Sequence, residues 1–189
     1  MKNIFLSSLL ILFGSCYSNK ATGSYWVNKT VYTKVGLHYQ EGVHHSLNIL
    51  SGANIPVGSA LTVIYVTEDK AKVLYGNYEL TMKNSYRVSR KEMDLYLGTI
   101  FSEKPVKYEF PEEFQRKVDH GLPVVGMTKN QVIRSCGYPP VIGTKSTGLD
   151  TWRYWLSKYK CIDLYFENGK LMDIRDAEFN LDPMTLLTY

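Results

Sequence analysis

Cysteine and histidine, whose side chains commonly act as nucleophiles, bases and metal ligands, are few in this sequence and widely separated. The 3 cysteines are Cys16, Cys136 and Cys161, and all 4 histidines precede Cys136. A catalytic cysteine requires a group that stabilises its thiolate and a second group that orients this partner. Because no histidine lies close to Cys136 or Cys161 in the sequence, we expect neither thiol to be catalytic.

The adjacent pair His44 and His45 is the arrangement most suggestive of a metal site. Adjacent residues of a strand point to opposite faces of a sheet. No cluster of Cys, Asp or Glu is spaced to complete a set of ligands around the pair. We therefore expect a solvent-exposed histidine pair, no metal site and no other cofactor.

Acid–base and serine chemistry are also without support. Glu112 and Glu113 are adjacent in a short predicted helix, and neighbouring helix positions do not face a common substrate. The sequence contains no nucleophile elbow, no phosphate-binding loop and no serine–histidine–aspartate order. These patterns predict a protein that is not an enzyme.

The composition indicates a globular, β-rich protein. Of 189 residues, 44% are hydrophobic and 13% aromatic, and the aromatic share is dominated by 15 Tyr, which suit half-buried sheets and contact surfaces. Lys and Arg number 22 against 18 Asp and Glu, a net charge of +4 without any basic run. This balance lacks the electrostatic pattern of a nucleic-acid-binding protein, so we expect no nucleic-acid partner.

The N-terminal segment has the features of an export signal. Lys2 precedes an apolar run ending at Phe13, which is too short for a bilayer span of ~20 residues. The sequence Phe13-Gly14-Ser15-Cys16 resembles a bacterial lipobox. The resemblance implies that residues 1–15 are a signal peptide, that Cys16 carries lipid such as palmitate, and that residues 16–24 are a tether. It also implies an outer-membrane location, at the periplasmic face or the cell surface; the alternative is ordinary cleavage near Cys16.

Residues 25–85 predict a small, mainly-β barrel or sandwich. Short β-branched and aromatic runs are separated by turn residues, and Gly76-Asn77 lies between two alternating runs as in a hairpin. The run from Ile55 to Asn84 resembles bacterial SH3-like barrels. Trp26 and Tyr32 are candidate exposed aromatic residues for binding a partner.

Residues 86–120 are expected to form a helical linker region between two folding units. The spacing Met93, Tyr96, Leu97 and Ile100 predicts an amphipathic helix over residues 89–101. Ser89, with Glu92 three positions later, has the spacing of a capping box that would open this helix.

Residues 121–176 carry the clearest pattern. Thr128 and Gln131 have capping-box spacing, and Gly137 followed by Pro139 ends the helix. Three strands are then predicted, the last two joined by an Asn-Gly turn at Gly169.

This segment is similar to the SmpA/OmlA domain of BamE, the small lipoprotein of the outer-membrane β-barrel assembly machinery. The resemblance implies an α+β fold of one helix and an antiparallel sheet, like the repeats of β-lactamase-inhibitor protein, with residues 177–189 as a tail. The matching positions, all explicable as scaffold, are Gly126, Met127, Thr128, Gln131, Val132, Gly137, Pro139, Trp152, Tyr154, Phe166 and Gly169.

Alternation along two of these strands assigns side chains to faces. Trp152 and Tyr154 share a face and are expected to cover the helix, whereas Trp155 points to the other side and is a candidate exposed aromatic residue. Cys161 is expected to face away from the helix that carries Cys136. A disulfide between the two cysteines is therefore disfavoured, and we expect two semi-buried free thiols.

Three functions are compatible with these patterns. The first is a non-catalytic envelope lipoprotein that acts by protein–protein contact, in outer-membrane protein assembly or envelope integrity, with β-barrel assembly components among its candidate partners. The second is a lipoprotein that binds peptide, glycan or cell wall. The third, a hydrolytic enzyme, has the least support. An aromatic groove for the second function would draw on Tyr25, Trp26, Tyr32, Tyr39, Tyr65, Tyr75 and Tyr78.

Overall fold

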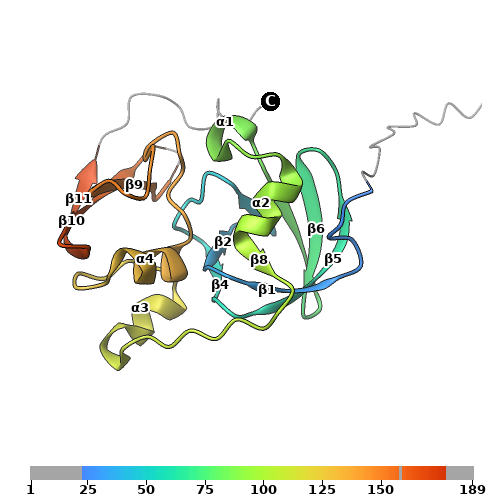
Figure 1. Ribbon diagram of the computed structural model, residues 1–189, viewed down its shortest axis with the longest axis horizontal. Coiled ribbons are helices and arrows are strands. Elements are labelled where there is room, and N and C mark those ends of the chain that lie inside the picture. Colours follow the sequence, from blue (N-terminus) through green and yellow to red (C-terminus); the bar gives the residue numbers. More distant parts are fainter. Residues whose placement is uncertain (1–22, 158, 178–189) are drawn as a thin grey trace, which may run out of the picture.

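The computed structural model describes residues 23–157 and 159–177, which form a mixed α+β protein (Figure 1). A curled sheet with the shape of a half-barrel makes up one side of the molecule, and a smaller sheet with short helices makes up the other. We call residues 23–102 the N-terminal half and residues 121–177 the C-terminal half. The predicted signal peptide, Cys16 and all of the predicted tail beyond residue 177 lie outside the described residues.

The N-terminal half is built around a six-stranded sheet with the order β3-β7-β6-β5-β1-β8. All neighbouring strands are antiparallel except β3 and β7, which run parallel. Strands β2 and β4 form a separate antiparallel pair. The strands are β1 (Thr30–Thr33), β2 (Leu37–Tyr39), β3 (Val43–His45), β4 (Ala53–Ile55), β5 (Ala60–Val66), β6 (Lys70–Tyr75), β7 (Tyr78–Lys83) and β8 (Phe101–Ser102).

The predicted strands agree with this sheet in most places. The hairpin predicted at Gly76-Asn77 joins β6 and β7, with Tyr75 opposite Tyr78 and Gly76 at φ 58°. Two segments differ from what their composition favours: the aromatic and β-branched residues 25–27 form a turn, and residues 52–59, which are rich in turn residues, contain β4. Strand β3 carries His44 and His45 on opposite faces, in agreement with the strand geometry used for this pair in the sequence analysis.

Two helices lie between β7 and β8 in the sequence and belong to the N-terminal half. Helix α1 spans Tyr86–Ser89 and α2 spans Met93–Ile100. The predicted apolar stripe of α2 is buried in the core of the N-terminal half, so this helix is not a linker. The expected cap is also wrong: Glu92 precedes the first turn of α2, while Ser89 ends α1. A residue in the left-handed conformation, Arg90 at φ 56°, separates the two helices.

A short connection leads to the C-terminal half. It contains the 3₁₀ helix η1 (Glu112–Phe114) and α3 (Gln115–Asp119). Helix α4 (Lys129–Cys136) and the strands β9 (Thr151–Trp155), β10 (Cys161–Glu167) and β11 (Lys170–Ala177) follow. The three strands form an antiparallel sheet with the order β11-β10-β9. The predicted succession of one helix and three strands is therefore confirmed.

The ends of α4 also follow the prediction. The Thr128 amide donates to Gln131 Oε1 over 2.8 Å, and the Gln131 amide donates to Thr128 Oγ1 over 3.3 Å, which completes a capping box. Gly137 ends the helix at φ 81°, where a β-carbon would lie 2.8 Å from Asn48 Nδ2 and 2.9 Å from Gly36 O. Only glycine fits this position without displacing its neighbours.

The face of the C-terminal sheet that covers α4 holds the core of this half, and we call it the inner face. Trp152 and Tyr154 are fully buried there, as predicted, together with Val132 of the helix. The Trp152 ring lies 4.6 Å from the Phe166 ring, and the Tyr154 hydroxyl donates to Gly137 O over 2.8 Å. Hydrogen bonding thus ties the middle of β9 to the end of α4.

The opposite face, which we call the outer face, is also buried around Trp155. Trp155 has 0% exposure and packs with Cys161 against Leu47 and Val88 of the N-terminal half. The expectation that Trp155 is exposed is therefore wrong, because β9 lies between two packing partners. The sequence pattern of β9 shows only that Trp155 points away from α4.

Backbone contacts join the two halves over a seam. The Gly36 amide donates to Arg134 O over 2.9 Å, and Arg134 Nη1 donates to Lys34 O over 2.6 Å. A β-carbon on Gly36 would lie 1.9 Å from Ser135 O, so the strand and helix backbones are in direct contact. The Leu50 amide donates to Trp155 O over 2.7 Å at another point of the seam.

Candidate functional site

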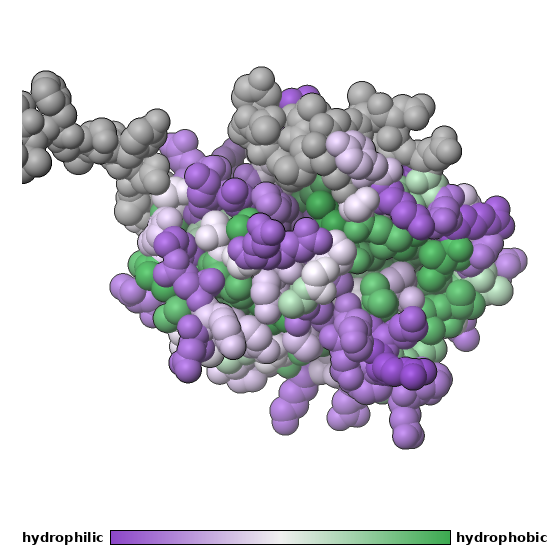
Figure 2. Space-filling model, turned by 180° about the vertical axis from the view of Figure 1, so that it is seen from behind, coloured by the Kyte–Doolittle hydropathy of each residue, from purple (hydrophilic) through white to green (hydrophobic). Residues whose placement is uncertain are grey.

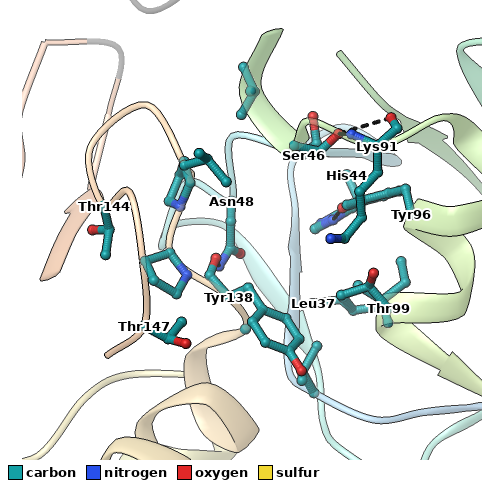
Figure 3. Close-up of a pocket in the computed structure, with 18 of the residues that line it drawn as sticks. Leu37, His44, Ser46, Asn48, Lys91, Tyr96, Thr99, Tyr138, Thr144 and Thr147 are labelled. Atoms are coloured by element: carbon teal, nitrogen blue, oxygen red, sulfur yellow. Dashed lines mark hydrogen bonds between the residues drawn. The ribbon is translucent and has the colours of Figure 1, made fainter. Parts of the chain in front are cut away.

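A cleft of about 350 Å³ opens between the two halves (Figure 3). One wall comes from β2, β3 and α2 of the N-terminal half. The other wall is the loop that follows α4, from Gly137 to Thr147. In Figure 3, Thr144 and Thr147 lie on the loop side and His44, Tyr96 and Thr99 on the other, with Asn48 between them.

The interior of the cleft is mainly apolar. Val35, Leu37 and Ile100 contribute from the N-terminal half, and Pro139, Pro140 and Val141 contribute from the loop. Small-molecule and peptide sites commonly combine such apolar walls with a few polar groups at fixed positions.

His44 is the best-defined polar group of the cleft wall. It is 2% exposed, and burial lowers its pKa to about 4, so the ring is neutral near pH 7. Nδ1 lies 2.7 Å from His38 O, and a carbonyl can only accept, so Nδ1 carries the hydrogen. Nε2 therefore accepts, and its partner at 2.7 Å, the Tyr96 hydroxyl, is the donor. This corrects the expectation of a solvent-exposed histidine pair.

The donor role of Tyr96 leaves its oxygen as an acceptor at the cleft. Burial raises the pKa of Tyr96, which keeps the hydroxyl protonated. Two other hydroxyls have the complementary property. Ser46 Oγ accepts from the Ser85 amide over 3.0 Å, and Thr144 Oγ1 accepts from the Arg153 amide over 2.8 Å. Each keeps a hydrogen to donate, so the cleft offers both hydrogen-bond donors and an acceptor.

Two lysines supply the charge of the cleft. Lys91 and Lys145 line it, whereas no carboxylate does so among the described residues. Figure 3 shows the Lys91 side chain extending into the cavity from the connection between α1 and α2. The cleft is therefore positive, and its potential favours an anionic group.

Asn48 holds the loop wall in place. Its Nδ2 group donates to Cys136 O over 2.8 Å and to Tyr138 O over 2.9 Å. The side chain is 5% exposed, and its Oδ1 atom has no hydrogen-bond partner among the described residues. An amide from the N-terminal half thus fixes the point where the loop leaves α4.

The residues singled out from the sequence lie mostly elsewhere. Trp26 packs against the core of the N-terminal half and donates from Nε1 to Asp94 O over 3.1 Å, and Tyr32 is half-buried on β1. Trp155 is buried in the seam. Of the motif residues, Gly137 and Pro139 line the cleft, whereas Met127, Val132, Trp152, Tyr154 and Phe166 form the core of the C-terminal half.

Sequence reasoning missed the residues that line the cleft from the N-terminal half. His44, Ser46 and Asn48 are close in sequence, but their partners Tyr96 and Tyr138 are distant. The available signal was a polar, histidine-containing segment between apolar strands, and a strand alternation in which His44 faces inward. Nothing in the sequence identified the loop that closes the other wall.

The described residues that line the cleft include no cysteine, aspartate or glutamate. Cys136 and Cys161 are free, as predicted, but they are fully buried and not semi-buried, and they lie in different apolar clusters. Burial raises the pKa of both thiols, which disfavours the nucleophilic thiolate. Within residues 23–157 and 159–177, no group of three or more His, Cys, Asp or Glu side chains could hold a metal ion.

The rear of the molecule has a different surface character. Figure 2 shows a band of apolar surface over the C-terminal half, bordered by polar side chains. Val125, Leu149 and Met172 are large apolar residues of this half with about half of their surface exposed, at 52%, 49% and 53%.

Comparison with known proteins gave no match to any family model, curated protein or solved structure. The part of the chain that the structure describes includes no helix of sufficient length and hydrophobicity to cross a membrane.

Proposed function

We propose that this chain is a non-catalytic envelope lipoprotein that binds a ligand in the cleft between its two halves. The single observation that carries the proposal is the cleft itself, an apolar cavity with a few fixed polar groups and two lysines. The ligand is a segment of a partner molecule or a small molecule of the envelope.

The hydrogen bonds of the cleft support binding over catalysis. His44 uses both ring nitrogens within the protein, one toward His38 O and one toward Tyr96. A general base must accept a proton from its partner; the lowered pKa of His44, about 4, makes the ring a weak base, and the raised pKa of Tyr96 makes its hydroxyl a poor proton donor. The polar groups of the cleft are suited to recognise a ligand.

The location and family remain part of the proposal. Lipid on Cys16 would hold the protein at the outer membrane, with the folded part in the periplasm or at the cell surface. The C-terminal half would be a BamE-like domain and the N-terminal half an SH3-like module; the capped α4 followed by three antiparallel strands supports the first assignment. Envelope protein assembly is then the favoured process, and wall binding is the alternative.

Site-specific photo-crosslinking tests the cleft. Tyr138 lines the cleft and is 41% exposed, and Tyr78 lies at the β6–β7 turn and is 74% exposed. A photoreactive phenylalanine at each position, in cells, provides a site and a matched control. We expect a crosslinked product specific to position 138. A β-barrel assembly component would support the assembly role, and peptidoglycan fragments would support wall binding. Identical products from both positions would contradict cleft binding.

Membrane fractionation tests the anchor separately. A Cys16→Ser variant should leave the membrane fraction or accumulate unprocessed, because the acylated residue is lost. A mature protein that stays on the membrane with its original first residue would contradict lipidation.

A further inference from the structure

We infer that the cleft binds the carboxyl-terminal residues of an apolar peptide. This inference rests on the proposed function and specifies its ligand class. Three properties of the cleft lead to it: unpaired positive charge, hydrogen-bonding groups of both kinds, and apolar walls.

The positive charge of the cleft favours an anionic ligand. Lys91 and Lys145 make no ion pair or side-chain hydrogen bond with the described residues, and no carboxylate among those residues lines the cavity. The two lysines come from different halves, Lys91 from the connection after α1 and Lys145 from the loop after α4. Each wall therefore offers an ammonium group to an anion in the cleft, and charge-assisted hydrogen bonds are stronger than neutral ones.

The hydroxyl groups that line the cleft match the hydrogen-bonding pattern of a peptide group next to that anion. Tyr96 donates to His44 Nε2, so its oxygen accepts, and a ligand N–H is the matching donor. Ser46 and Thr144 accept backbone amides, so their hydroxyl hydrogens are available to a ligand carbonyl. A peptide group supplies both an N–H and a C=O, whereas a fatty acid supplies neither beyond its carboxylate.

The apolar walls of the cleft favour a peptide with apolar side chains. Leu37 and Ile100 face Pro139 and Val141 across the cavity. A sugar would place several hydroxyls against these walls, and burying them without partners costs free energy. A cavity of about 350 Å³ is at the small end of ligand sites, so it accommodates only the last residues of a chain. Capture of a terminal carboxylate is a known mode of peptide recognition.

Calorimetric titration of the purified chain with three probes tests this ligand class. The probes are N-acetyl-Leu-Leu with a free carboxylate, the same dipeptide as its carboxamide, and decanoate. We expect the free acid to bind about tenfold more tightly than the carboxamide, because the carboxamide lacks the charge-assisted contacts. We expect decanoate to bind more weakly than the free acid, because it lacks the N–H for Tyr96.

Variants link the binding to named groups. Lys91→Gln and Lys145→Gln should each weaken binding of the free acid several-fold, whereas Lys170→Gln, on the distant β10–β11 turn, should leave it unchanged. Tyr96→Phe should weaken binding of the dipeptide and leave binding of decanoate unaffected. Tyr78→Phe, at the exposed β6–β7 turn and outside the cleft lining, is the matched control.

Specific results would overturn the inference. Equal affinity for the free acid and the carboxamide would show that the cleft does not recognise the carboxylate. Whether the cleft binds a ligand at all would still be tested by the crosslink at Tyr138. Decanoate binding as tightly as the dipeptide, independent of Tyr96, would identify a hydrocarbon acid instead. Absence of binding by all three probes would refute the ligand class, and the crosslinking result would decide the proposed function separately.

Discussion

Both faces of the C-terminal sheet contain a fully buried tryptophan, but different kinds of partner cover the two tryptophans. The inner face packs on α4, which lies close in sequence, through Trp152 and Tyr154. The outer face packs on Leu47 and Val88, which come from the N-terminal half. A face covered by a neighbouring element can be read from local alternation, whereas a face covered by a remote segment cannot. The cleft likewise depends on segments that are remote in the sequence, because it forms only where the two halves meet.

The largest expected effect is on the inner face. Trp152→Ala removes a fully buried indole that stacks near Phe166 and donates from Nε1 to Leu149 O over 2.8 Å. We expect a loss of ~3 to 5 kcal/mol in the free energy of unfolding, measured by urea denaturation. A variant that unfolds like the wild type but loses ligand binding would mean that Trp152 is a binding residue and not a packing residue.

Trp155→Ala tests the outer face. Its complete burial predicts a loss of about 3 kcal/mol in the free energy of unfolding, at the lower end of the range for buried tryptophan. Limited proteolysis should also cut the variant faster between residues 103 and 120. Trp26→Ala, at a partly buried position, is the control and should lower the free energy of unfolding by less. Equal losses in the two variants would contradict a special role for burial of Trp155.

His44, which is also covered by a remote segment, makes the stability of the protein depend on pH. Its pKa falls from 6.5 to about 4 in the folded protein, so the unfolded chain binds a proton first as the pH drops. The stability that neutral His44 contributes is therefore complete above about pH 6.5 and is lost progressively as the pH falls toward 4. Between pH 7 and pH 5 this amounts to about 2 kcal/mol.

The measurement is urea denaturation at both pH values. Burial also lowers the pKa of His38 and His45, so the wild type loses more than the share of His44 alone. His44→Gln should reduce the loss by about 2 kcal/mol, whereas His120→Gln, at an exposed position, should leave it unchanged. An unaltered pH dependence in His44→Gln would contradict the buried, neutral ring.

Features that depend on residues close in sequence could be predicted, whereas features that depend on remote contacts could not. The capping box at Thr128, the end of α4 at Gly137 and the assignment of Trp152 and Cys161 to opposite faces depend on residues close in sequence, and each was predicted. The burial of Trp155 and His44 depends on contacts more than fifty residues apart, such as His44 with Tyr96. Local periodicity carries no information on which remote segment covers a face.

The smallest expected effect is at the start of α4, where the interaction is entirely local. The helix has only eight residues, so its unsatisfied terminal amides are a large share of its backbone groups. Thr128 Oγ1 satisfies the Gln131 amide, and Gln131 Oε1 in turn satisfies the Thr128 amide. Thr128→Ala should lower the free energy of unfolding by about 1 kcal/mol.

Conservative and reciprocal variants make this prediction specific. Thr128→Ser keeps the accepting oxygen and should stay close to the wild type, whereas Gln131→Ala removes the other half of the box and should cost a similar or smaller amount than Thr128→Ala. Because the cap is remote from the cleft, none of the three variants should change the affinity for N-acetyl-Leu-Leu by more than a small factor. A Thr128→Ala protein as stable as Thr128→Ser would show that tertiary packing of Val132 and Cys136, and not the cap, determines whether α4 forms.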